Sequence, residues 1–119
     1  MSRIYTPITS GAFVPLGNTV TFLANTQAPT AVQAVQTGAN DLSFCQYRIF
    51  NSGSVLVFVG VGSNTLNANT NAVVVTTTAN SVPVLPGTLE IISFPANSYF
   101  TAITASGTSQ VYLTPGIGV

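Results

Sequence analysis

The chain consists of short segments rich in Val, Thr, Ile, Phe and Tyr, which Gly, Pro, Asn and Ser interrupt about every 8–12 residues. The β-branched and aromatic residues fit the pleated surface of a sheet, whereas the interrupting residues favour turns. No segment shows a clear helical period. The pattern predicts an all-β fold, an antiparallel β-sandwich or jelly roll of about eight short strands.

Strands are expected where this pattern of β-branched and aromatic residues is clearest, at residues 19–23, 43–51, 55–61, 72–79, 88–94, 99–105 and 110–114. Residues 31–36 fit either a strand or one helical turn, and residues 62–71 are expected to form a polar, Asn-rich loop. The Asn-Ser-Gly sequence at 51–53 predicts a β-hairpin between its flanking strands. Ser-Gly-Thr at 106–108 predicts another hairpin, and residues 115–119 are expected to form a short tail.

Two neighbouring strands indicate where the core lies. Segment 43–51 alternates, with one face carrying Phe44, Gln46, Arg48 and Phe50 and the other carrying Cys45, Tyr47 and Ile49. Segment 55–61 is almost continuously apolar, which is typical of a strand with both faces covered. We expect the core on one of its faces and a loop or a partner on the other.

The N-terminal segment differs from the rest. Residues 1–16 contain Pro7, Gly11 and Pro15, and they are expected to form an extended arm, with a short edge strand near Phe13, ahead of one sandwich domain at 17–119. An arm of this kind would dock on a neighbouring subunit. The candidate interface residues are Arg3, Ile4, Tyr5, Ile8 and Phe13. The alternative is that the segment is simply a strand of its own domain.

Charge is scarce, since only 3% of the residues are charged against about 25% in typical soluble proteins. Two basic and two acidic side chains cancel, so the chain lacks the positive charge that nucleic-acid binding requires. Its longest apolar run is too short for a membrane helix. A net charge near zero promotes association, which favours a protein that is covered by partners in an assembly.

The inventory of reactive side chains argues against an enzyme. The sequence has no His and no Lys, and Asp41 and Glu90 are its only carboxylic side chains. The single Cys45 is expected to be a buried thiol. We therefore expect no catalytic residue, no cofactor and no metal site. The expected role of Glu90 is an ion pair, either with Arg48 or with a neighbouring chain.

Glycan binding remains an alternative role. Tyr5, Tyr47, Tyr99 and Tyr112 could form an aromatic platform for sugars, and the Asn-rich segment 62–71 could hydrogen-bond a glycan. Packing in the core or an interface is the better explanation for the tyrosines, because most of them lie in alternating strands.

Three segments carry a family resemblance: YRIFNSGSVLVFVGVGS (47–63), VPVLPGTLEIISFP (82–95) and AITASGTSQVYLTPGIG (102–118). In this order they resemble small β-proteins encoded among the structural genes of tailed bacteriophages. The resemblance implies a virion protein on the capsid surface, a head decoration or cement protein. Its implied partners are the major capsid protein and further copies of itself, as a trimer. The alternatives are a phage tail, collar or fibre-associated protein that binds host glycan, and a cellular protein with a lectin-like sandwich.

Overall fold

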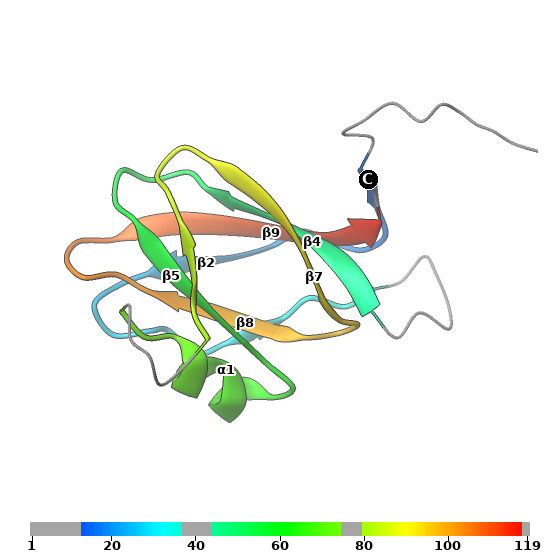
Figure 1. Ribbon diagram of the computed structural model, residues 1–119, viewed down its shortest axis with the longest axis horizontal. Coiled ribbons are helices and arrows are strands. Elements are labelled where there is room, and N and C mark those ends of the chain that lie inside the picture. The colour runs from blue at the N-terminus through cyan, green and yellow to red at the C-terminus, as the bar shows by residue number, and fades with distance from the viewer. Residues whose placement is uncertain (1–12, 37–43, 75–79, 118–119) are drawn as a thin grey trace, which may run out of the picture.

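The computed structural model describes residues 13–36, 44–74 and 80–117. They form two antiparallel sheets that pack face to face, with a single short helix beside them (Figure 1). The first sheet contains β1 (Val14–Pro15), β2 (Val20–Ala24), β4 (Phe44–Asn51), β7 (Leu89–Pro95) and β9 (Ser109–Ile117). The second sheet contains β3 (Val32–Gln33), β5 (Val57–Gly62), β6 (Val82–Val84) and β8 (Tyr99–Ile103).

The strand order is that of a jelly roll. In the first sheet β9 pairs with β4 on one side and with β2 and β1 on the other, which gives the order β2-β9-β4-β7. The second sheet has the order β3-β8-β5-β6. Most consecutive strands lie in opposite sheets, as in the double-sheet jelly roll. The predicted antiparallel β-sandwich is therefore confirmed, in its jelly-roll form.

Both predicted hairpins are wrong. β4 pairs with β7 and β9, whereas β5 pairs with β6 and β8, so residues 52–56 cross from one sheet to the other. Likewise β8 and β9 lie in different sheets, and residues 104–108 form a second crossing. Turn residues permit a reversal of the chain but do not dictate that the two strands pair. Two strands with apolar inner faces share a core equally well from opposite sheets.

The buried side chain of Asn51 holds the first crossing in place. Its Nδ2 donates hydrogen bonds to the carbonyl oxygens of Val55 (2.8 Å) and Val84 (3.0 Å). Its Oδ1 accepts from the Gly53 N–H (3.2 Å) and from the Ser109 hydroxyl. The Asn51 amide thus provides hydrogen-bond partners for backbone groups at this crossing, where strand pairing does not. Buried backbone groups need such partners.

The segment expected to be a polar loop contains helix α1 (Thr65–Asn71). Asn64 caps it, since its Oδ1 accepts a hydrogen bond from the Asn67 N–H (2.8 Å). The sequence misleads here because Asn and Thr are weak helix formers. α1 lies against β5 and β8 (Figure 1), and the backbone of the helix approaches Gly60 and Gly62 so closely that neither position has room for a Cβ atom. The outer face of β5 is thus covered by the chain itself.

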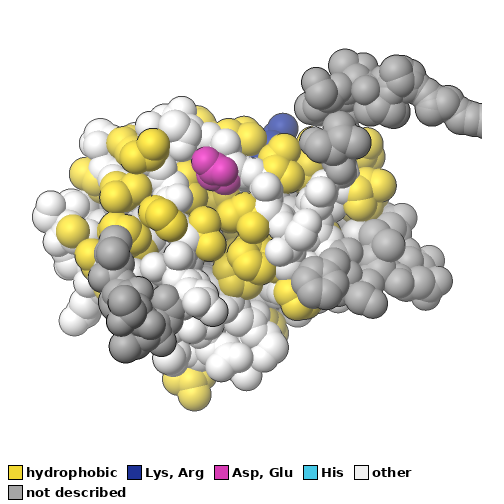
Figure 2. All heavy atoms as spheres, viewed as in Figure 1, with side chains coloured by type: hydrophobic (Ala, Val, Ile, Leu, Met, Phe, Trp, Pro, Cys, Tyr) yellow, Lys and Arg dark blue, Asp and Glu magenta, His cyan; other side chains and the backbone are white. Residues whose placement is uncertain are grey.

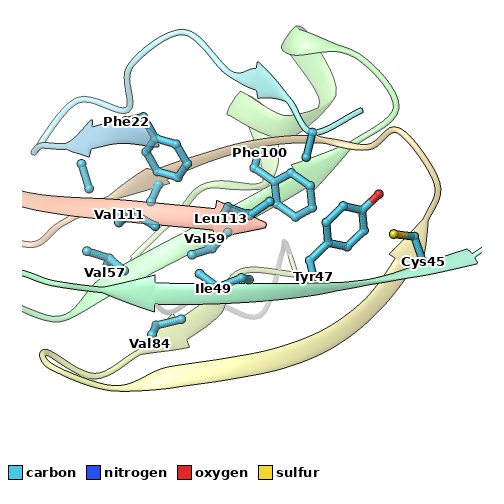
Figure 3. Close-up of a cluster of buried hydrophobic side chains, with 13 residues drawn as sticks. Phe22, Cys45, Tyr47, Ile49, Val57, Val59, Val84, Phe100, Val111 and Leu113 are labelled. Atoms are coloured by element: carbon cyan, nitrogen blue, oxygen red, sulfur yellow. The ribbon is translucent and has the colours of Figure 1, made fainter. Parts of the chain in front are cut away.

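The core lies between the two sheets (Figure 3). Cys45, Tyr47 and Ile49 point into it, as the alternation of segment 43–51 predicts. The Tyr47 ring lies 4.7 Å from the Phe100 ring between centroids, and the Phe94 ring lies 5.9 Å from that of Phe100. These aromatic contacts join the two sheets at one end of the sandwich, at separations typical of favourable ring pairs.

The start of the described chain is part of the first sheet. Val14 and Pro15 pair with β9, which confirms the short edge strand expected near Phe13. The expected strand at 110–114 is longer than predicted, because β9 extends to Ile117. No strand follows α1 at residues 72–74, and the rest of the strand expected at 72–79, residues 75–79, lies outside the described residues.

Candidate interaction surface

The outer face of the first sheet exposes a row of apolar side chains. Tyr112 of β9 lies opposite Phe50 of β4, and Phe50 lies opposite Leu89 of β7. Directly opposed residues of antiparallel strands point to the same face. Leu23 and Ile91 lie on this face too, by the alternation of their strands. We call the set of Leu23, Phe50, Leu89, Ile91 and Tyr112 the outer band.

All five residues of the outer band are exposed. The exposed fractions of its side chains run from 36% for Ile91 to 48% for Leu23. Scattered apolar residues are normal on a protein surface, but a contiguous row marks an interaction site. Figure 2 looks onto the β7 edge of the sandwich rather than onto the outer face; hydrophobic side chains also lie there, with one acidic side chain in the middle of the view and one basic side chain at its rim.

The predicted ion pair between Arg48 and Glu90 is not brought together. Arg48 lies opposite Ile91 and Glu90 lies opposite Ile49, so the two charged side chains belong to opposite faces of the sheet. Instead the guanidinium carbon of Arg48 lies 5.4 Å from the centre of the Phe13 ring, a cation–π distance. An ion pair of Glu90 with a neighbouring chain stays a prediction, and Asp41 lies outside the described residues.

The expected interface arm is only partly described. Phe13 is half-buried, and its ring lies over Gly116 so closely that a Cβ there would meet it. This side chain therefore contacts its own domain through Arg48 and Gly116. Arg3, Ile4, Tyr5 and Ile8 lie outside the described residues.

Strand β7 adds a free edge beside the outer band. Among the described residues it pairs with β4 alone, and Leu89, Glu90 and Ile91 are all exposed. Natural sheets usually protect long edges with several charges, bulges or a covering segment. Here one carboxylate and the terminal Pro95 are the only such devices in the strand itself. The edge therefore offers backbone hydrogen-bonding groups next to the apolar row.

Comparison with family models, curated proteins and solved structures finds no match to this chain.

A pocket of about 360 Å³ lies at the end of the sandwich, beside the turn from β7 to β8. It was not predicted, because it joins segments far apart in the sequence. Its lining residues are Val61, Gly62, Ser63, Asn71, Asn80, Phe94, Pro95, Ala96, Asn97 and Ser98.

The structure places Cys45 and three of the four tyrosines. Cys45 is buried, as expected, and lies 3.3 Å from the Gly116 carbonyl oxygen; burial raises its pKa. Tyr47 belongs to the core, Tyr99 is half-buried and Tyr112 belongs to the outer band, while Tyr5 lies outside the described residues. None of the described tyrosines lines the pocket.

Two features are absent from the described residues. No three His, Cys, Asp or Glu side chains lie together in a way that could hold a metal ion. No helix there has the length and apolar character needed to cross a membrane.

Proposed function

We propose that this chain is a structural virion protein, a decoration or cement protein that stabilises a phage head by binding across coat subunits. The observation that carries the proposal is the outer band on the first sheet. The family resemblance of the sequence supplies the phage context.

The electrostatics of the chain support an assembly role. The outer face of the first sheet presents Arg48 as its one described charged side chain, while Glu90 lies on the other face of β7. Desolvating such a face costs little, because few charges have to give up their hydration. A typical stable interface buries about 1,600 Å² in total. A symmetric capsid repeats each contact many times, so individually modest contacts sum to high avidity.

Charge substitutions in the outer band test the proposal. Phe50→Lys and Tyr112→Lys place a charge on the proposed contact face, and both wild-type side chains are partly exposed, so the fold should tolerate the change. Leu66→Lys is the matched control, because Leu66 is 75% exposed on α1, away from the first sheet. The measurement is the number of copies bound per purified particle, by gel densitometry, together with the heat resistance of the particle.

We expect the two outer-band variants to lose at least tenfold in occupancy while Leu66→Lys binds like the wild type. Wild-type occupancy of both outer-band variants would refute the proposal. Hundreds of copies per particle agree with a cement protein, whereas a dozen or fewer would favour the tail or collar alternative.

A further inference from the structure

We infer that the pocket beside the β7–β8 turn is a binding site for a neutral sugar residue. This inference does not depend on the proposed function, because the pocket and the outer band are made by different residues.

The lining of the pocket indicates the class of ligand. None of its ten residues carries an ionisable side chain, so no opposite charge in the lining would compensate the desolvation of an anion or a cation. Asn and Ser provide both hydrogen-bond donors and acceptors, which match the dual character of sugar hydroxyl groups. Phe94, Pro95 and Val61 supply apolar surface of the kind that contacts the C–H face of a sugar ring. The volume of about 360 Å³ lies at the lower end of the range for small-molecule sites.

The turn that forms one wall is fixed from inside the protein. The Tyr47 hydroxyl donates to the Pro95 carbonyl oxygen (2.8 Å), and the Ser98 N–H donates to the Tyr47 oxygen (3.3 Å). Asn97 has a φ of 61°, a left-handed conformation that Asn tolerates better than most residues. Such conformations persist where the surrounding structure holds them.

Two further contacts hold Asn97 from the side of β3. The Gln36 N–H donates to its Oδ1 (2.9 Å), and Gln33 Nε2 donates to its carbonyl oxygen (3.0 Å). A wall held by four hydrogen bonds to neighbouring segments is preorganised, which lowers the entropic cost of binding.

The remaining amides keep hydrogen-bonding capacity for a ligand. Asn71 donates from Nδ2 to the Val61 carbonyl oxygen (2.8 Å), which orients the side chain and leaves its Oδ1 without a partner among the described residues. Asn80 is exposed, and its side-chain amide likewise has no partner within the described ranges. The opposite wall can therefore both accept and donate.

The test titrates the full chain with single sugars and follows binding by saturation-transfer NMR and by the amide spectrum of the protein. The neutral probes are glucose, galactose, mannose and N-acetylglucosamine, and the charged probes are glucuronic acid and N-acetylneuraminic acid. We expect at least one neutral sugar to bind with a Kd below about 10 mM, which corresponds to a free energy of about −2.7 kcal/mol. The charged probes should bind more weakly.

Two variants place the binding in the pocket. Asn80→Ala removes an amide that holds nothing in the described structure, so we expect unchanged thermal unfolding and about three- to tenfold weaker sugar binding. Asn18→Ala is the matched control, because Asn18 is also exposed but lies outside the pocket. The inference is overturned if no neutral probe binds, if the charged probes bind more tightly, or if Asn80→Ala binds like Asn18→Ala.

Discussion

The phenolic oxygen of Tyr47 lies 2.8 Å from the carbonyl oxygen of Pro95. A core side chain of β4 therefore donates a hydrogen bond to the turn that leads from the first sheet to the second. The same oxygen accepts the Ser98 N–H. A single buried hydroxyl thus satisfies two backbone groups at a crossing between the sheets.

Replacing Tyr47 by Phe is expected to lower the free energy of unfolding by about 1–2 kcal/mol. It removes one of two donors to the Pro95 carbonyl, which keeps the Ser98 hydroxyl (2.6 Å), and it leaves the Ser98 N–H without this acceptor. Urea unfolding followed by circular dichroism measures the change. Tyr112→Phe is the control, since Tyr112 is 42% exposed and its hydroxyl makes no hydrogen bond within the described structure. Equal stabilities of the two variants would contradict this account of the turn.

Stability should fall at alkaline pH. Burial raises the pKa of the Cys45 thiol and of the Tyr47 hydroxyl above their ordinary values of about 8.5 and 10. The folded state therefore holds these protons more tightly than the unfolded state does. Their stabilising contribution is complete below the unfolded pKa values and is lost as the pH rises above them.

The measurement is urea unfolding at intervals between pH 7 and pH 11. Cys45→Ala should flatten the decline that begins near pH 8.5, and a second variant, Tyr47→Phe, should flatten the part that begins near pH 10. A Cys45→Ala variant with the same pH profile as the wild type would show that the thiol is not the titrating group.

Asn51→Ala is expected to cost about 2–4 kcal/mol, since it removes a buried amide that binds Val55, Val84 and the Ser109 hydroxyl. The exposed Asn18→Ala should change stability by less than about 0.5 kcal/mol. Thermal and urea unfolding compare the two variants. A small effect at Asn51 would mean that the crossing holds without its side chain.

Gly60→Ala and Gly62→Ala should each displace α1 from β5, because an added Cβ would collide with the backbone of Ala68 or Ala72 at the first position and of Ala68 at the second. We expect a loss of more than about 2 kcal/mol for each, in the range of overpacked cores. Ser54→Ala, at an exposed position outside α1, is the control. Hydrogen exchange of the α1 amides tests the location of the damage, and unchanged protection there would contradict it.

The sequence allowed the class of fold and the core face of β4 to be predicted, because both follow from local alternation. Cys45, Tyr47 and Ile49 are buried because alternate residues of a strand point to the same face, here the core face. The pairing of strands could not be read in this way. Asn51, Ser52 and Gly53 are as suitable for a hairpin as for a crossing, and only the bonds of Asn51 to the distant Val84 and Ser109 distinguish them.

The helix and the pocket were missed for related reasons. α1 is stabilised by packing on Gly60 and Gly62, which leave room for its backbone. This tertiary contact cannot be predicted from the helix propensities of Asn and Thr. The pocket requires Asn71, Asn80 and Asn97 to meet, and nothing in their sequence spacing indicates that they do. The outer band was foreseeable only as one face of β4, since its neighbours depend on the order of the strands.

The central position of β9 in the first sheet has a consequence for synthesis. β9 pairs with β1, β2 and β4, all of which leave the ribosome long before it does. Until residue 117 emerges, β2 lacks its partner strand and β4 has only β7 beside it, so the apolar inner faces of β2 and β4 are incompletely covered. Nascent chains should therefore depend on chaperones or fast completion to avoid aggregation, and the slow formation of such distant pairings should limit the refolding rate.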